Sequence, residues 1–190
     1  MATYTNSWKN KALLGWFMLQ LPIILFMDLL DYIWPAWVYQ PEGAPLHAAY
    51  KVKEWYIGKY NDPIVQWTAE TASGHDSWMG LFMHLEFLFL LPTVAYGIYR
   101  LGVQRRGTSG ADELLFLLYA LEMALTTLIC IYDVSYWDAA AYSTALKREL
   151  QVQLYGPWCV IPALIGLDMA TRILRRIKAA DAVGAVRKSL

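Results

Sequence analysis

Four long runs of apolar residues, separated by polar stretches, follow one another along the 190-residue chain. They cover about residues 12–38, 78–101, 113–133 and 152–174. Each run has the length of about 20 residues that an α-helix needs to cross the hydrocarbon of a bilayer. Because backbone polar groups find no water there, each run must be a helix. The pattern therefore predicts an all-α integral membrane protein, a four-transmembrane-helix bundle.

Prolines and one long connection add detail to this prediction. We expect the interior prolines to kink or locally open three of the four helices, at Pro22, Pro92, Pro157 and Pro162. The connection over 39–77 is rich in Tyr, Trp and Pro, and a loop of that length is expected to fold as a cap. We expect residues 1–190 to form a single membrane domain that ends in a basic tail over 175–190.

Composition and charge support a membrane protein and give it an orientation. Of the residues, 57% are hydrophobic and 17% are charged, and the formal net charge of zero does not suggest a nucleic-acid partner. Eleven of the sixteen Lys and Arg lie in the N-terminal segment, the connection 102–112 with its flanking Arg100, and the segment from Arg172 onward. The positive-inside rule then predicts that both termini are cytosolic and that the capping loop is lumenal. The basic tail is expected to lie over anionic headgroups.

Acidic side chains lie inside three of the apolar runs. Glu86 is eight residues into the second run, Asp28 is near the lumenal end of the first, and Glu122 is in the middle of the third, one turn before Thr126. A carboxylate at membrane depth costs at least a few kcal/mol, so it normally faces the protein interior and has a partner. We expect no basic side chain at that depth. Either some of the acids are protonated, or a cationic or hydroxylated ligand pairs with them. A purely structural alternative is that the acids are neutral and only form hydrogen bonds between helices.

The remaining polar groups have simpler interpretations. We expect His84 to be an interfacial or structural hydrogen-bonding group, Asp31 to be solvated near a helix end, and Asp168 to pair with Arg172 at i, i+4. The two cysteines are expected to be buried free thiols.

Neither a metal nor an organic cofactor is expected. The three histidines lack the spacing of metal ligands, and no paired carboxylates accompany them at His47, His75 and His84.

Several short motifs, taken together and in order, resemble one family. They are LPIILFMDL at 21–29, the pair Asp62-Pro63, the run from Trp78 to Pro92, TTLI at 126–129, and Tyr155 followed by Pro157, Trp158, Ile161 and Pro162. With these motifs the chain resembles the EXPERA superfamily, four-helix membrane proteins that include the sigma-2 receptor and the emopamil-binding sterol isomerase. The resemblance is closest to the sigma-2 receptor branch.

The resemblance implies a kinked four-helix bundle in the endoplasmic reticulum membrane, often a homodimer. It implies an occluded pocket for sterols, terpenoids or amphiphilic amines. By position, Asp28 would pair with a ligand amine, Asp62 would support it from the capping loop, and Glu86 would belong to the same network. The resemblance also implies pocket-lining roles for Thr127, Tyr155 and Trp158.

Two functions remain open. The first is a binding protein for a sterol or another amphiphile, acting in lipid handling. The second is a cofactor-free isomerase or cyclase, in which Glu86 or Glu122 protonates an alkene or epoxide and a second acid, with Asp28 as a candidate, stabilises the cation and removes a proton elsewhere. The isomerase branch uses a Glu with a nearby Thr on its third helix, and Glu122 and Thr126 are similar to that pair.

Overall fold

A computed structural model describes residues 8–68 and 77–188 of the chain. These residues form helices joined by turns, and none of them lies in a β-strand. Four helical stretches are long and apolar enough to cross a membrane, at Trp8–Asp28, Trp78–Val103, Gly110–Val134 and Thr144–Val183. The predicted all-α membrane fold is confirmed. His75 lies outside the described residues, and so do the side chains of Arg187 and Lys188 in the predicted tail.

The helices group into two compact units, one of residues 14–98 and one of residues 1–13 and 99–190. The unit of residues 14–98 is called the cap unit here because it contains the predicted capping loop; the other is called the long-helix unit.

In the cap unit, the first apolar run does not continue as a helix to residue 38 as expected. The α-helix α1 (Trp8–Ile23) opens into the π-helical segment η1 (Ile24–Asp28), and Leu29 breaks it with φ −99° and ψ 13°. A short helix α2 (Leu30–Ile33) ends at Trp34, which is extended because it precedes Pro35. The Trp34 indole N–H donates to the carbonyl of Leu25 at 3.2 Å, so a carbonyl near the helix end is satisfied.

The remaining elements of the cap unit follow in order. They are the 3₁₀ turn η2 (Ala36–Val38), α3 (His47–Tyr60), α4 (Ser77–Leu85), the π-helical segment η3 (Glu86–Leu90) and α5 (Leu91–Ile98). Thus the longest element in the described part of the long connection is the helix α3, and α3 packs against η1. Asn61 ends α3 in the left-handed conformation, with φ 48°.

The π-helical segment η3 has a local cause. Pro92 cannot donate to a carbonyl four residues earlier, and its ring would clash with that carbonyl. Widening the helix over Glu86–Leu90 removes this conflict without breaking the helix. The same arrangement recurs where η5 (Glu149–Tyr155) precedes Pro157. Pro92 and Pro157 therefore follow locally opened helices, as expected, whereas Pro22 and Pro162 lie inside the α-helices α1 and α8.

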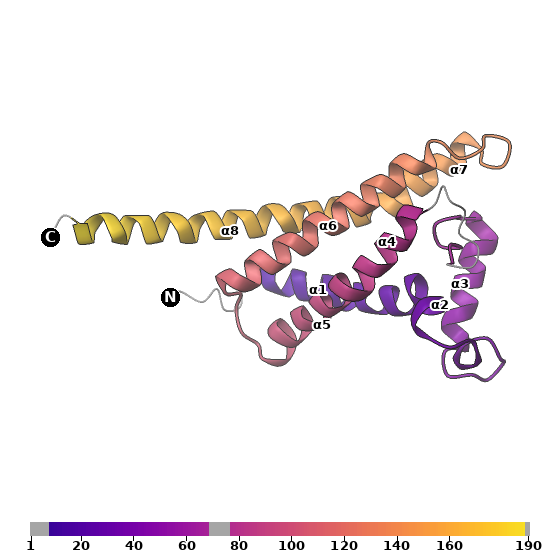
Figure 1. Cartoon of the computed structure of the whole chain (residues 1–190), viewed down its shortest axis with the longest axis horizontal. Coiled ribbons are helices and arrows are strands. Elements are labelled where there is room, and N and C mark those ends of the chain that lie inside the picture. The colour runs from indigo at the N-terminus through magenta and orange to yellow at the C-terminus, as the bar shows by residue number, and fades with distance from the viewer. Residues whose placement is uncertain (1–7, 69–76, 189–190) are drawn as a thin grey trace. The chain divides into compact units, whose positions relative to one another are not determined.

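The long-helix unit contains η4 (Tyr99–Val103), α6 (Gly110–Val134), α7 (Thr144–Arg148), η5 and α8 (Gly156–Lys188). A capping box starts α6: the Ser109 N–H donates to Asp112 at 2.7 Å, and the Asp112 N–H donates to the Ser109 hydroxyl at 3.2 Å. Figure 1 shows α6 and α8 side by side, with α8 continuing past the beginning of α6. At about 1.5 Å per residue, α8 is longer than the hydrocarbon of a bilayer, so it extends beyond the predicted end at residue 174.

The outward face of α6 is apolar, as a lipid-facing helix requires. Its exposed side chains recur every three or four residues, at Leu114, Leu118, Leu121, Leu125, Leu128 and Tyr132. The buried ones lie on the opposite side, at Glu113, Phe116, Ala120, Thr127, Cys130 and Val134. Cys130 and Cys159 are both free thiols, and Cys130 is the buried one.

Candidate functional site

In the cap unit, two of the predicted acids meet. Asp28 is the last residue of η1 and Glu86 is the first residue of η3, so each lies where a helix is widened. Both side chains are half-buried, and the two carboxyl groups lie close enough to interact. Two carboxylates at such a separation repel each other, so the pair is more stable when one carboxyl is protonated and donates to the other.

The third predicted acid, Asp62, is fully buried next to this pair. The Tyr56 hydroxyl donates to Asp62 Oδ2 at 2.8 Å, and the Ile64 N–H donates to Asp62 Oδ1 at 2.9 Å. Burial, followed by the charge of Asp62, raises the pKa of Tyr56 above its ordinary value, so the phenol stays a donor. Asp28 is within electrostatic range of Asp62. The three acids Asp28, Asp62 and Glu86 are called the acidic cluster below.

A basic side chain also reaches this cluster, and here the sequence-based expectation is wrong. Lys53 of α3 is buried, its ammonium donates to Asp31 Oδ2 at 2.7 Å, and its charge acts on Asp28. Asp31, expected to be solvated, is exposed but carries this ion pair. No pattern in the sequence points to Lys53, because it lies in the loop and becomes a neighbour of Asp28 only when α3 folds against η1.

Aromatic rings of α2, α4 and η3 lie close in sequence to Asp28 and Glu86. Tyr32 packs edge-on against His84, with ring centroids 5.7 Å apart, and against Phe87 at 5.6 Å. The His84 Nδ1 contacts the Gly80 carbonyl, which agrees with the structural hydrogen bond expected for His84. Trp67 lies against Gly80, and its indole Nε1 is buried without a hydrogen-bond partner among the described residues.

The other predicted pocket residues lie in the long-helix unit. Thr127 is buried in α6, and Tyr155 and Trp158 are half-buried at the junction of η5 and α8. Both η5 and α8 pack against α6. Next to Trp158, the Cys159 thiol contacts the Ala124 carbonyl of α6 at 3.6 Å.

Glu122 of α6 has an unusual environment. Its Oε2 atom is buried and has no hydrogen-bond partner in the part of the chain that the structure describes. The Thr126 hydroxyl does not supply one, since it donates to the backbone carbonyls of Glu122 and Met123 at 2.9 and 3.2 Å. A buried carboxyl oxygen without a partner is costly, so Glu122 stays a candidate site residue.

An ionic network elsewhere in the long-helix unit was not predicted, apart from one pair. Asp168 pairs with Arg172, as expected, with the Arg172 Nε donating at 2.8 Å. Arg172 also donates to Asn10 at 2.6 Å and to Thr108 at 3.1 Å. This network joins α1, the 104–109 connection and α8.

A second part of the same network surrounds a fully buried acid. Glu113 accepts two hydrogen bonds from Arg176, at 2.6 and 2.9 Å, and one from the Thr108 hydroxyl at 2.8 Å. Arg176, expected to lie over headgroups, is therefore half-buried and paired with an acid of the protein interior. Every oxygen of Glu113 is satisfied, which indicates a structural role for it.

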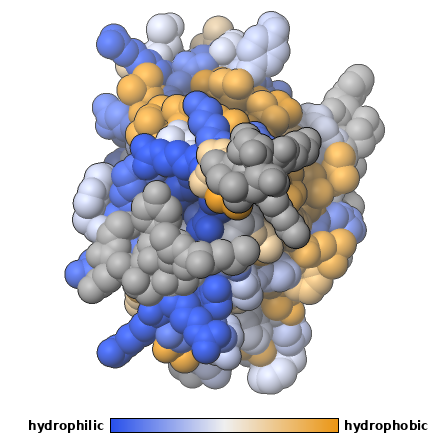
Figure 2. All heavy atoms as spheres, turned by 90° about the vertical axis from the view of Figure 1, so that its left-hand side faces the viewer, coloured by the Kyte–Doolittle hydropathy of each residue, from blue (hydrophilic) through white to orange (hydrophobic). Residues whose placement is uncertain are grey.

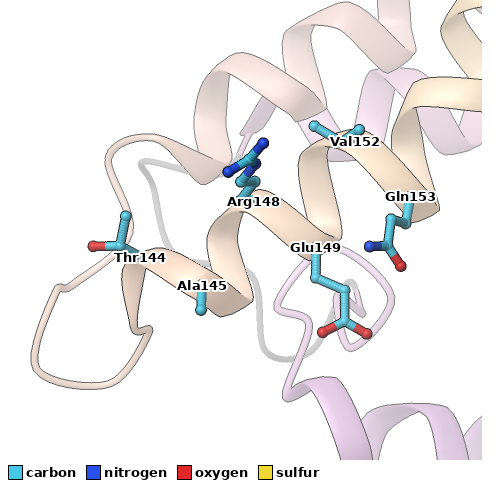
Figure 3. A pocket seen from close by; sticks show the side chains of 6 residues that line it. All are labelled: Thr144, Ala145, Arg148, Glu149, Val152 and Gln153. Carbon is cyan, nitrogen blue, oxygen red and sulfur yellow. The ribbon is translucent and has the colours of Figure 1, made fainter.

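A hollow of about 590 Å³ lies at the start of the fourth apolar stretch. Its lining side chains point in different directions, with Arg148 and Val152 on one side of the helix and Glu149 and Gln153 on another (Figure 3). Because these groups do not converge on one point, and none is a predicted site residue, we do not assign a binding site there.

The fold and the acidic cluster define a multi-pass membrane protein with ionisable groups inside its apolar segments. The sequence profile of the EXPERA (EXPanded EBP superfamily) family matches residues 48–169, which is more than half of the chain. The chain belongs to this family. The matched range contains Asp62, Glu86 and Glu122, whereas Asp28 precedes it. No curated protein matches the sequence.

Proposed function

We propose that the protein binds a sterol, a terpenoid or another amphiphilic small molecule, with the polar end of that molecule at the acidic cluster. The observation that carries this proposal is the proximity of the Asp28 and Glu86 carboxyl groups to each other and to the buried Asp62. A protonated carboxyl donates to a hydroxyl or ether oxygen, and an ionised one accepts from a hydroxyl or pairs with an amine. Thr127, Tyr155 and Trp158 are proposed as pocket-lining residues.

Affinity and orientation would have different sources. Burial of the hydrocarbon body supplies most of the affinity, at about 25 cal/mol per Å² before the costs of binding are subtracted. The contacts to the acidic cluster fix which end of the ligand enters first. With such binding the protein would act in sterol or lipid handling, as a sensor or a carrier.

A second candidate function is a cofactor-free isomerase or cyclase, and the buried, unpartnered Oε2 of Glu122 favours it. Glu122 or Glu86 would transfer a proton to an alkene or epoxide, which forms a carbocation. An ionised acid, for which Asp28 is the candidate, would take a proton from another carbon, so the substrate is isomerised without net gain or loss of atoms. Exclusion of bulk water from the pocket would protect the cation.

We further propose an endoplasmic reticulum location with both termini cytosolic, and a homodimer as the assembly. The orientation is supported by the basic residues at the end of α8 and in the preceding loops, among them Arg105, Arg106, Arg175 and Lys178. Figure 2 is turned so that the end of α8 faces the viewer; hydrophilic residues lie toward the centre and left of this view, and hydrophobic residues lie above and to the right.

The experiment that tests the proposed function compares three proteins: wild type, Asp28→Asn and Glu122→Gln. Each is purified in mild detergent, its co-purifying lipids are identified by mass spectrometry, and membranes containing it are incubated with sterol and terpenoid pools. A binding protein predicts an enriched amphiphile that Asp28→Asn loses and Glu122→Gln keeps, with no new product. A product of unchanged mass that disappears in Glu122→Gln would establish the isomerase or cyclase. If no amphiphile is enriched and no product forms, both functions are refuted.

A further inference from the structure

Lys53 occupies an uncommon position for a lysine. It lies on α3 on the same face as Tyr56 and Tyr60, which are three and seven residues further along. Only 4% of its surface is exposed, and lysine is almost never buried to that extent without a partner. From this one face of α3, Tyr56 reaches Asp62 and Lys53 reaches Asp31.

The ammonium of Lys53 lies among several acids. It donates to Asp31 at 2.7 Å, and Asp31 is three residues from Asp28 across the break at Leu29. Its charge also acts on Asp28, whose carboxyl group interacts with that of Glu86. The acidic cluster therefore has a cation beside it, which is supplied by the loop helix and held in place by Asp31.

An internal cation changes which ligands the acidic cluster prefers. A bare group of carboxylates attracts an amine, since the ligand then supplies the missing positive charge. When an ammonium is already close, a second cation meets repulsion and must compete for the same carboxylate, whereas a hydroxyl group meets neither. The effect is strong because low-dielectric surroundings screen charges poorly.

We propose that Lys53 is a specificity-determining residue, an internal counter-ion that directs the acidic cluster toward neutral, hydroxylated amphiphiles and against cationic amines. This inference rests on the proposed binding function and goes beyond it, because the proposed function leaves amines and hydroxylated ligands equally possible. It also assigns a role to the capping loop: α3 brings the charge that decides which class of polar head is accepted.

The experiment uses the full-length protein and two probes, a 3β-hydroxysteroid and the same steroid with a 3β-dimethylamino group. Binding of each is measured by competition against a tritiated steroid for wild type, Lys53→Met and Lys53→Arg. Lys51→Met is the matched control, since Lys51 is an exposed lysine on the same helix that pairs with Glu54. Lys53→Met keeps the length of the side chain and removes its charge.

We expect wild type, Lys53→Arg and Lys51→Met to favour the hydroxysteroid. In Lys53→Met the affinity for the aminosteroid should rise about tenfold or more relative to that for the hydroxysteroid, which corresponds to the loss of one short-range charge interaction. Because Lys53→Met leaves Asp31 without its cation, it can fail to fold. The double variant Asp31→Asn/Lys53→Met, which removes both members of the ion pair, is measured alongside it and is expected to show the same gain.

The outcomes separate the two proposals. The hydroxysteroid can bind while the ratio of its affinity to that of the aminosteroid is the same in wild type and in the folded variant, either Lys53→Met or Asp31→Asn/Lys53→Met. That result refutes the role of Lys53 and leaves the binding function standing. A wild type that prefers the aminosteroid refutes that role as well. If neither steroid binds to any variant, the binding function itself is wrong, and the inference falls with it.

Discussion

The hydrogen bond from Tyr56 to Asp62 offers a sharp test of how the cap unit is held together. Tyr56→Phe removes only the hydroxyl that donates to the fully buried Asp62 at 2.8 Å. A hydrogen bond to a charged group contributes about 1.5–3 kcal/mol. For a chain of this length, about 2 kcal/mol corresponds to a decrease of about 4–8 °C in the melting temperature. The measurement is thermal unfolding in detergent, followed by intrinsic fluorescence.

The same variant makes a prediction about pH. Because the pKa of Tyr56 is raised in the folded protein, the phenol loses its proton more easily in the unfolded chain. The stabilisation is therefore fully present below the pKa of an unfolded tyrosine, at about 10, and is lost as the pH rises above it. The difference in melting temperature between wild type and Tyr56→Phe should be constant from pH 7 to about pH 9 and decrease at higher pH.

A matched control is Tyr136→Phe. Tyr136 is exposed and its hydroxyl contacts only that of Tyr132 among the described residues, so the melting temperature should change by no more than about 1–2 °C. The reasoning is refuted if Tyr56→Phe melts within that same margin of wild type at pH 7.

Three further predictions concern packing and the long-helix unit. Glu113→Gln breaks the ion pair between the fully buried Glu113 and the half-buried Arg176 and should cost about 3 kcal/mol in thermal unfolding, whereas Asp181→Asn at an exposed position of α8 should change stability little. Equal melting temperatures would argue against a structural role for the pair. Gly97→Ala places a Cβ 2.3 Å from the Phe17 ring and should lower the free energy of unfolding by about 1–3 kcal/mol. Adding Phe17→Leu should restore part of that stability. No loss of stability in Gly97→Ala would show that α1 and α5 can separate freely. Thr126→Val should change stability by less than about 1 kcal/mol and leave lipid binding intact, because its hydroxyl bonds only to carbonyls of its own helix among the described residues; loss of bound lipid would place Thr126 in the site.

The features of the fold that could be predicted from the sequence are those whose physical cause lies within a few residues along the chain. The apolar runs predict spanning helices because a bilayer leaves the backbone no alternative, and Pro92 predicts a local opening because its conflict lies one turn away. The pair Asp168–Arg172 is one turn apart on one helix, so its spacing alone predicts it. Pro35 explains in the same local way why α2 cannot extend to residue 38.

The features that could not be predicted depend on contacts distant in sequence. Lys53 meets Asp31 across 22 residues, and Arg176 meets Glu113 across 63. The residues that flank Lys53 and Arg176 in the sequence do not indicate that either side chain is buried. The sequence alone therefore predicts that both are surface charges. The face of α3 that carries Lys53 and Tyr56 is determined by its packing on η1, which the loop composition does not reveal.

The central claim is that the polar end of an amphiphilic ligand lies at the acidic cluster of the cap unit. Photo-crosslinking tests it most directly, with a steroid that carries a diazirine next to its polar group and with mass spectrometry of the labelled peptides. We predict labels within η1 and η3, near Asp28 and Glu86, that an excess of unlabelled steroid removes and that Asp28→Asn/Glu86→Gln reduces. Labels confined to the exposed face of α6, unaffected by competition and by the double variant, would contradict the account.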